Sequence, residues 1–236
     1  MYMSRLLHLD TVDSTNSYLK MHRAELSHAT VVYADTQTAG RGRYDRTWVS
    51  QEGGLYFSVL LKPPYNPFLP NLTQLMALAI CQALETYGLL PAIKWPNDVQ
   101  VSGKKISGIL SEAVFDKSVF QAVVLGVGIN VNQKDVGHVG QPATSLKALG
   151  VQTTRETVLK NVLQFFWQGY PALCEKGFET ICPAYTQRFA ALGKNITVKD
   201  GDKTIFGQAE GISPRGTLLL RTAQGLKEIY IGDVLA

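Results

Sequence analysis

The sequence has few of the residues and spacings that mark secreted or zinc-binding proteins. It contains three cysteines, Cys81, Cys174 and Cys182, and none of them forms a Cys-x-x-Cys spacing. An odd, scattered set of cysteines is typical of free thiols in a reducing compartment, so it argues against a disulfide framework. The four histidines are equally scattered and lack the spacing of a zinc-ligand motif. Any chemistry of this chain is therefore expected from other residue types.

Long hydrophobic runs are also missing. The N-terminal segment Met1–Asp10 has no apolar core of the length that a signal peptide requires. The apolar stretch around Leu75–Leu84 is interrupted by Gln82 and followed by Glu85, and a membrane span needs a longer run than this. We therefore expect a soluble, cytoplasmic protein that has no membrane partner.

A strong excess of one charge is absent as well. The net charge is +4 and the isoelectric point is about 8.9, and most lysines and arginines are dispersed along the chain. Nucleic-acid binding requires clustered cations, so the sequence predicts no nucleic-acid partner. The hydrophobic content of 45% is ordinary for a globular protein and sufficient for a core.

Hydrophobic periodicity predicts an α+β domain over residues 1–192, with a mixed, mostly antiparallel central sheet and flanking helices. Consecutive strands joined by short turns imply an antiparallel meander. The expected strands are Arg5–Leu9, Thr30–Ala34, Leu55–Leu61, Ala92–Trp95, Val99–Val101, Lys105–Phe115 and Val119–Asn130. The expected helices are Asn16–Leu26, Leu72–Tyr87, Thr154–Cys174 and Glu179–Leu192, the last with Pro183 in its first turn.

The pattern changes near Leu192–Lys194. Short strands separated by glycine-containing turns then follow at nearly regular spacing, which is typical of a small barrel. They are expected at Asn195–Lys199, Ile205–Glu210, Thr217–Leu220 and Leu226–Tyr230. The sequence therefore predicts a second domain over residues 193–236.

The segment Gly40–Trp48 combines two glycines, three arginines and a tryptophan. Glycine lets the main chain approach a ligand closely, and arginine supplies fork-shaped donors that match phosphate and carboxylate oxygens. The segment has neither the Walker phosphate-loop spacing nor the dinucleotide-binding glycine spacing. It predicts either a loop that closes over an anionic, flat ligand or a solvated basic turn.

Two further segments place polar groups where the backbone turns. Asp13–Asn16 precedes a helix, where its side chains could cap that helix or hydrogen-bond the polar head of a small ligand. At the corner after Trp95, Asn97 and Asp98 are consistent with ordinary turn chemistry. A carboxylate such as Asp98 could instead meet a magnesium ion or orient an amine. Trp95 itself is expected in the core.

A fourth segment contains Lys104 and Lys105 at the start of a strand. Because successive side chains alternate between the two faces of a strand, only one of these lysines is expected to point into a site. A lysine among apolar neighbours needs an anionic or carbonyl partner. The glycines of Gly126–Asn130, on the next strand, are expected to clear space for a flat ring.

In their order along the chain, these segments resemble the catalytic core of the biotin protein ligases. The resemblance rests on Asp13–Asn16, the Gly40–Trp48 loop, Lys94–Asp98 with Lys105–Leu110, and Gly128–Asn130. It implies the class II synthetase-like, biotin–lipoate ligase fold followed by an SH3-like barrel. It also implies a two-step reaction: biotin and MgATP form biotinyl-5′-AMP and pyrophosphate, and a lysine of the biotin carboxyl carrier protein of acetyl-CoA carboxylase then accepts the biotinyl group.

The resemblance also carries roles to individual residues. The biotin-binding set is Ser14, Thr15, Asn16, Gln37, Gly40, Arg41, Gly42, Arg43 and Lys105. The nucleotide-binding set is Arg43, Arg46, Trp48, Asn97, Lys105 and Asn130. The catalytic set is Lys105, Arg41, Arg43 and Asp98, of which Asp98 is the candidate for contact with Mg²⁺ through MgATP.

The sequence departs from the family in two ways. Asp45 stands where family members often have a second glycine, and its carboxylate could pair with Arg46 and stiffen the loop. There is also no room before Asp13 for a helix-turn-helix domain, so we expect a ligase that lacks a repressor function. The alternatives are a lipoate–protein ligase and a non-catalytic sensor of biotin. Members of the family can dimerise through the central sheet, and the sequence leaves the oligomeric state open.

Overall fold

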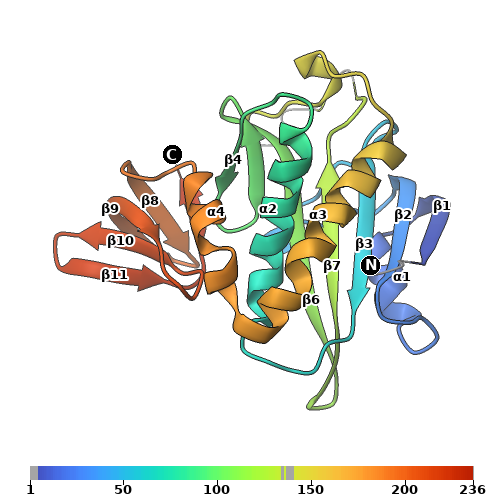
Figure 1. The fold of residues 1–236 in the computed structure, drawn as a ribbon, viewed down its shortest axis with the longest axis horizontal. Coiled ribbons are helices and arrows are strands. Elements are labelled where there is room, and N and C mark those ends of the chain that lie inside the picture. Colours follow the sequence, from blue (N-terminus) through green and yellow to red (C-terminus); the bar gives the residue numbers. More distant parts are fainter. Residues whose placement is uncertain (1–4, 134–135, 137–140, 236) are drawn as a thin grey trace.

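The computed structural model describes residues 5–133, 136 and 141–235, with the side chain of Asp45 left out. A seven-stranded sheet forms the larger part, in the order β1-β2-β3-β7-β6-β5-β4 (Figure 1). Its strands are β1 (Leu6–Val12), β2 (Thr30–Gln37), β3 (Leu55–Leu61), β4 (Pro91–Lys94), β5 (Asp98–Val101), β6 (Lys104–Asp116) and β7 (Val119–Ile129). Only β1 and β2 pair in parallel; the other neighbours are antiparallel. The expected mixed, mostly antiparallel sheet is confirmed.

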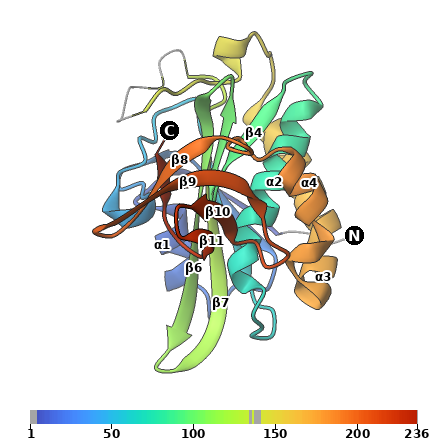
Figure 2. The same ribbon diagram turned by 90° about the vertical axis from the view of Figure 1, so that its left-hand side faces the viewer.

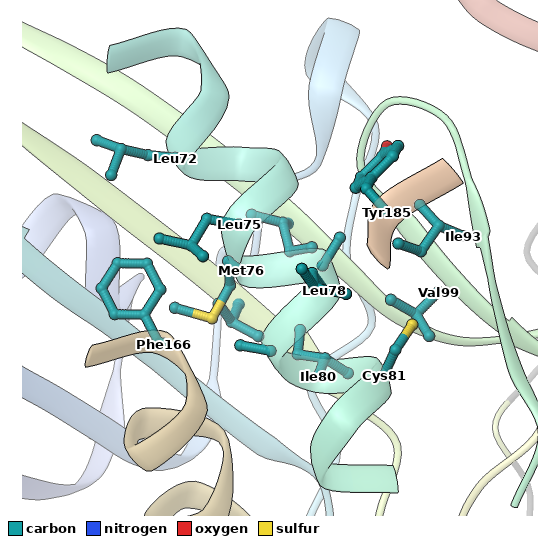
Figure 3. Packing of buried hydrophobic residues seen from close by; sticks show 14 of the residues in the cluster. Leu72, Leu75, Met76, Leu78, Ile80, Cys81, Ile93, Val99, Phe166 and Tyr185 are labelled. Atoms are coloured by element: carbon teal, nitrogen blue, oxygen red, sulfur yellow. The ribbon is translucent and has the colours of Figure 1, made fainter. Parts of the chain in front are cut away.

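Helices cover both faces of this sheet. Helices α2 (Leu72–Glu85) and α3 (Arg155–Lys176) pack against one face, and α1 (Thr15–Met21) lies on the other (Figure 1). Alternation along β3 explains the two apolar layers, since Val59 and Leu61 face α2 and α3 while Leu60 faces α1. Figure 3 shows the larger layer around α2. No helix in the described part of the chain is long and apolar enough to cross a membrane.

Two helices are shorter than expected. Helix α1 ends at Met21, because turns occupy the following residues and carry Leu26 into the apolar layer below α1. The predicted helix Glu179–Leu192 is reduced to α4 (Cys182–Gln187), which follows a 3₁₀ turn at Phe178–Thr180. Beyond α4 the chain runs beside β4, with backbone hydrogen bonds between Ile93 and residues 188 and 190. The proline in the first turn of α4 is confirmed.

A five-stranded antiparallel sheet follows, in the order β11-β10-β9-β8-β12, and Figure 2 faces it. Its strands are β8 (Asn195–Asp200), β9 (Lys203–Ile212), β10 (Leu218–Thr222), β11 (Gly225–Ile229) and β12 (Asp233–Leu235). The predicted small β-structure after residue 192 is confirmed as an antiparallel domain. Strand β12 is an addition to the strands expected from the sequence.

The turn between β9 and β10 joins the second domain to the first. The carbonyl oxygen of Gly216 accepts hydrogen bonds from Trp95 Nε1 at 3.1 Å and from Gln74 Nε2 at 2.8 Å. The neighbouring carbonyl of Arg215 accepts from Asn71 Nδ2 at 3.1 Å. Trp95 is buried, so its expected place in the core is confirmed, and its indole N–H also ties the two domains together.

We predict that Gly216→Ala destabilises the protein more than Gly150→Ala does. Both glycines have left-handed backbones, with φ of +84° and +80°, so alanine strains both by about 1–2 kcal/mol. At Gly216 an added Cβ would also stand 2.4 Å from Asn71 Nδ2 and 2.5 Å from Gln74 Oε1, whereas at Gly150 it meets nothing. Urea unfolding is expected to show a further loss of about 2 kcal/mol at Gly216. Equal losses of unfolding free energy in the two variants would contradict the role of this turn in joining the two domains.

Candidate active site

A cavity of about 780 Å³ opens between the Gly40–Trp48 loop, the sheet and the end of the second domain. Almost every residue predicted for the site lines it. These are Ser14, Thr15, Asn16, Gln37, Arg41, Gly42, Arg43, Arg46, Trp48, Asn97, Asp98, Lys105 and Asn130. Gly40 is the exception: it lies beneath the loop, where an added Cβ would stand 2.5 Å from both Ser50 Oγ and the Trp48 carbonyl oxygen.

A chain of hydrogen bonds forms the wall at the start of α1. Gln37 accepts from the backbone N–H of Thr15 at 2.9 Å and donates to Ser50 Oγ at 2.8 Å. Ser58 Oγ lies 2.7 Å from Thr15 Oγ1 and 2.5 Å from Asn16 Oδ1. Ser14 makes no side-chain cap to α1, so the capping alternative is wrong for its hydroxyl. This wall is polar and, apart from the half-buried Gln37, buried, and hydrogen bonds connect its side chains.

The glycine–arginine loop is folded back on itself. The Gly40 carbonyl accepts from Trp48 N at 3.0 Å, and Gly42 N donates to the carbonyl of Arg46 at 2.6 Å. Between them, Arg43–Asp45 forms a 3₁₀ turn in which Tyr44 has a left-handed backbone with φ of 54°. The loop is therefore an ordered turn that is closed by backbone hydrogen bonds at its two glycines.

Two arginines of this loop contact the second domain. Arg46 Nη2 forms an ion pair with Asp233 at the start of β12, and Arg43 Nη1 lies 3.4 Å from the same carboxylate. The Gly232 carbonyl accepts from both terminal nitrogens of Arg43 at 3.3 Å. Arg43 Nη1 also donates to Asn97 Oδ1 at 2.9 Å. The predicted Asp45–Arg46 pair lies outside the described residues, because the side chain of Asp45 is not among them.

Trp48 and Lys105 meet over the glycines of the sheet. An added Cβ on Gly128 would stand 2.4 Å from the Trp48 indole, and one on Gly108 would stand 2.8 Å from it. The flat ring expected over Gly128 is thus the protein's own indole, while Gly126 is covered by the amide of Asn16. Trp48 Nε1 is buried and has no hydrogen-bond partner among the described residues.

Lys105 is the lysine that points inward, in agreement with the expectation that only one of the pair enters the site. Its Nζ lies 5.2 Å from the centre of the Trp48 ring and forms a 2.8 Å ion pair with Asp98 Oδ1, although that oxygen has no aligned hydrogen bond. Lys104 is exposed and does not line the cavity. Asn130 donates to the Thr144 carbonyl at 3.0 Å, which fixes the segment at the rim.

Four further residues of the site, Glu112, Ser58, Ser50 and Asp233, are not among those predicted from the sequence. Glu112 accepts hydrogen bonds from Asn16 and Lys20 and contacts Arg41 at 3.3 Å. Burial alone would raise the pKa of Glu112, but its hydrogen bonds and the charges of Lys20 and Arg41 lower it below the usual value. A carboxylate near the middle of the long strand β6 was the signal for Glu112. Nothing local marks Asp233, since it is 187 residues from Arg46.

The described residues contain one group of His, Cys, Asp or Glu side chains that could hold a metal ion. It comprises His8, Asp10 and Asp35, none of which lines the cavity. Asp35 also pairs with Arg155 at 2.8 Å, which competes with a cation. In the cavity the carboxylate of Asp98 is already paired with Lys105. The described side chains therefore do not form a metal cage there.

Comparison with known proteins decides the family. The model of the biotin/lipoate A/B protein ligase family matches residues 9–130, and that of the biotin protein ligase C-terminal domain matches residues 191–235. This chain belongs to the biotin protein ligase family. Its catalytic fold and its C-terminal antiparallel domain are both confirmed as the fold expected from the resemblance.

Individual relatives support this membership over nearly the whole chain. The bifunctional ligase/repressor BirA of Bacillus subtilis is 37% identical, and the match covers 97% of this chain and 73% of BirA. The biotin–[acetyl-CoA-carboxylase] ligase of Paracoccus denitrificans is 34% identical, with 96% of this chain and 98% of that protein covered. The biotin protein ligase from Aquifex aeolicus in complex with biotin and ATP matches with a TM-score of 0.88 at 36% identity, over 98% and 97% of the two chains.

We predict that Asp233→Asn loosens the glycine–arginine loop. The substitution keeps the shape of the side chain but removes the charge that Arg43 and Arg46 share. Partly exposed ion pairs contribute about 1 kcal/mol, so trypsin is expected to cleave at these arginines about 5-fold faster. Asp202→Asn, in the exposed turn between β8 and β9, is the control. An unchanged cleavage rate would show that Asp233 does not hold the loop.

Proposed function

We propose that the cavity binds biotin against the wall of Thr15, Asn16 and Gln37 and binds ATP toward Trp48 and Lys105. The single observation that carries this arrangement is that four cations, Arg41, Arg43, Arg46 and Lys105, line the same cavity as the neutral, polar side chains of that wall. We expect the carboxylate of biotin and the triphosphate of ATP to meet beside these cations. The indole N–H of Trp48 is buried and has no partner within the described part of the chain, which supports a ligand with an acceptor atom at that place.

The reaction of the family requires two anions to react with one another. A carboxylate oxygen of biotin attacks the α-phosphorus of ATP, a new P–O bond forms, and the bond to pyrophosphate breaks. The amine of an acceptor lysine then attacks the acyl carbon, and AMP leaves. Catalysis by this chain is therefore expected to come from alignment and from cations fixed before the reaction. It needs no protein nucleophile.

The proposed roles follow the places of the residues. Ser14, Thr15, Asn16 and Gln37 hold the head group of biotin. Arg41, Gly42, Arg43 and Lys105 bind the carboxylate and the α-phosphate, while Arg46, Trp48, Asn97 and Asn130 face the nucleotide. Gly40 lacks a side chain, which lets the loop pack closely against Ser50 and the Trp48 carbonyl. Asp98 orients Lys105 through their ion pair.

Mg²⁺, the acceptor protein and the assembly are parts of the same proposal. Mg²⁺ enters with the phosphates of ATP, because the described carboxylates of the cavity are already paired with cations. The acceptor is the biotin carboxyl carrier protein of acetyl-CoA carboxylase, in the cytoplasm. The homodimer that the family permits remains a prediction. Biotin-dependent ATP–pyrophosphate exchange tests the function, and exchange that requires lipoate instead would contradict it.

Lys105→Ala is expected to abolish most of this exchange. The change removes a cation next to the reacting anions and leaves Asp98 without its partner, which together predict a loss of about 100- to 1,000-fold. Lys104→Ala is the matched control, since the neighbouring lysine is exposed and does not line the cavity. Near-normal exchange by Lys105→Ala would remove this lysine from the reaction.

Arg43→Gly is expected to release the adenylate sooner. Arg43 is held by Asn97 and by the second domain, so it is placed to close over a bound phosphate. The loss of one charge-assisted contact predicts a dissociation rate about 10- to 100-fold higher, together with labelling of lysines on bystander proteins. Arg5→Gly, at an exposed position before β1 that does not line the cavity, is the control. An unchanged rate of adenylate release would refute the role of Arg43.

A further inference from the structure

Glu112 lies just behind the polar wall of the cavity. It stands on β6 and is not among the residues that line the cavity, and its side chain is 23% exposed. Its oxygens accept from Asn16 Nδ2 at 2.8 Å and from Lys20 Nζ at 2.9 Å. Arg41 Nη2 lies 3.3 Å from both oxygens. Glu112 therefore contacts two residues of the proposed biotin site without facing that site itself.

These contacts leave the amide of Asn16 a single orientation. An asparagine side chain has two N–H donors and one oxygen with two lone pairs. The two donors point toward Glu112 and toward the Leu110 carbonyl, which is 3.3 Å away. An ionised carboxylate and a carbonyl can only accept, so a reversed amide would place three acceptors together. The nitrogen of Asn16 must therefore face β6.

On its other side, Asn16 keeps one acceptor position that no described residue uses. Its Oδ1 receives a hydrogen bond from the fully buried Ser58 hydroxyl at 2.5 Å. Gly126 leaves the room for this oxygen, because an added Cβ would stand 2.2 Å from it. With both donors occupied and one lone pair in use, the remaining hydrogen-bonding capacity of the side chain is an acceptor. Since Asn16 lines the cavity, it can offer this acceptor to a ligand N–H.

We propose that Glu112 is a positioning residue for the head-group site: it orients Asn16 so that Oδ1 accepts from an N–H of the ureido ring of biotin. The ureido ring carries two N–H donors, so an acceptor in the wall matches it and a reversed amide would oppose it. Glu112 also holds Arg41 against the same wall, which ties the glycine–arginine loop to this site. The inference rests on the proposed binding of biotin in this cavity.

The first test is Glu112→Gln, measured as the dissociation constant of biotin by titration calorimetry and as the KM values in pyrophosphate exchange. A glutamine amide can present either its oxygen or its nitrogen, so Asn16 loses its single orientation. We expect the dissociation constant and the KM for biotin to rise about 10-fold, and the KM for ATP to change less than about 2-fold. Glu210→Gln, which removes an exposed ion pair of the second domain, is the matched control.

The second test asks whether Glu112 acts through Asn16. In an Asn16→Ala background, Glu112→Gln is expected to lose most of its effect on biotin affinity, because the side chain that it orients is gone. If the two losses add in full, the proposal is wrong. If the Glu112→Gln variant does not fold, the Ser58→Ala variant replaces it. Ser58→Ala should also weaken the binding of biotin rather than the binding of ATP.

The wild-type protein separates the two levels of the proposal. A wild type without biotin-dependent exchange would overturn the proposed function itself. A wild type that exchanges, beside a Glu112→Gln variant with unchanged biotin affinity, would overturn only the role of Glu112. Equal increases of the KM values for biotin and for ATP would also overturn this role, because a general loosening of the fold weakens the binding of both substrates.

Discussion

Repulsion among cations is the constraint on which the cavity depends. Arg41, Arg43 and Arg46 belong to one short loop, and Lys105 faces the same space. Two positive charges 4 Å apart repel by about 4 kcal/mol near a protein surface. Carboxylates supplied by three different strands offset this repulsion: Glu112 on β6, Asp233 on β12 and Asp98 on β5.

This pairing explains how the site can be ordered before any anion arrives. A phosphate or carboxylate that enters exchanges one anionic partner for another, so it meets cations that are already oriented. Such preorganisation is the source of most electrostatic catalysis. It also moderates affinity, because each new contact replaces an existing one. A moderate affinity suits a site that must release its product to another protein.

The sequence predicted the sheet and most of the wall because their signals are local. Strand alternation predicted that only one of Lys104 and Lys105 enters the site, the family resemblance pointed to Lys105, and the glycines of β7 pointed to a close approach by a flat group. The ends of two helices were wrong: turns after Met21 end α1, and hydrogen bonds between Ile93 and residues 188 and 190 replace the helical pattern after α4. Asp233 could not be predicted, because an aspartate near a chain end has no local feature that links it to a distant loop. Ser58 was missed for a similar reason: a serine in an apolar strand is distinguished only by the side chains across from it.

The contact between Asp233 and the glycine–arginine loop also has a consequence for the order of folding. The two parts are 187 residues apart, so the loop can be held only after the second domain has formed and docked on the turn at Gly216. Contacts of such long range are made late, since closing the intervening chain costs entropy before the contact stabilises anything. We expect the central sheet to form earlier, because most of its paired strands are neighbours in the chain. In a partly folded chain, the polar wall for a head group would thus be present before the basic loop makes its contact with Asp233. We therefore expect the last step of folding to be the one that completes the site.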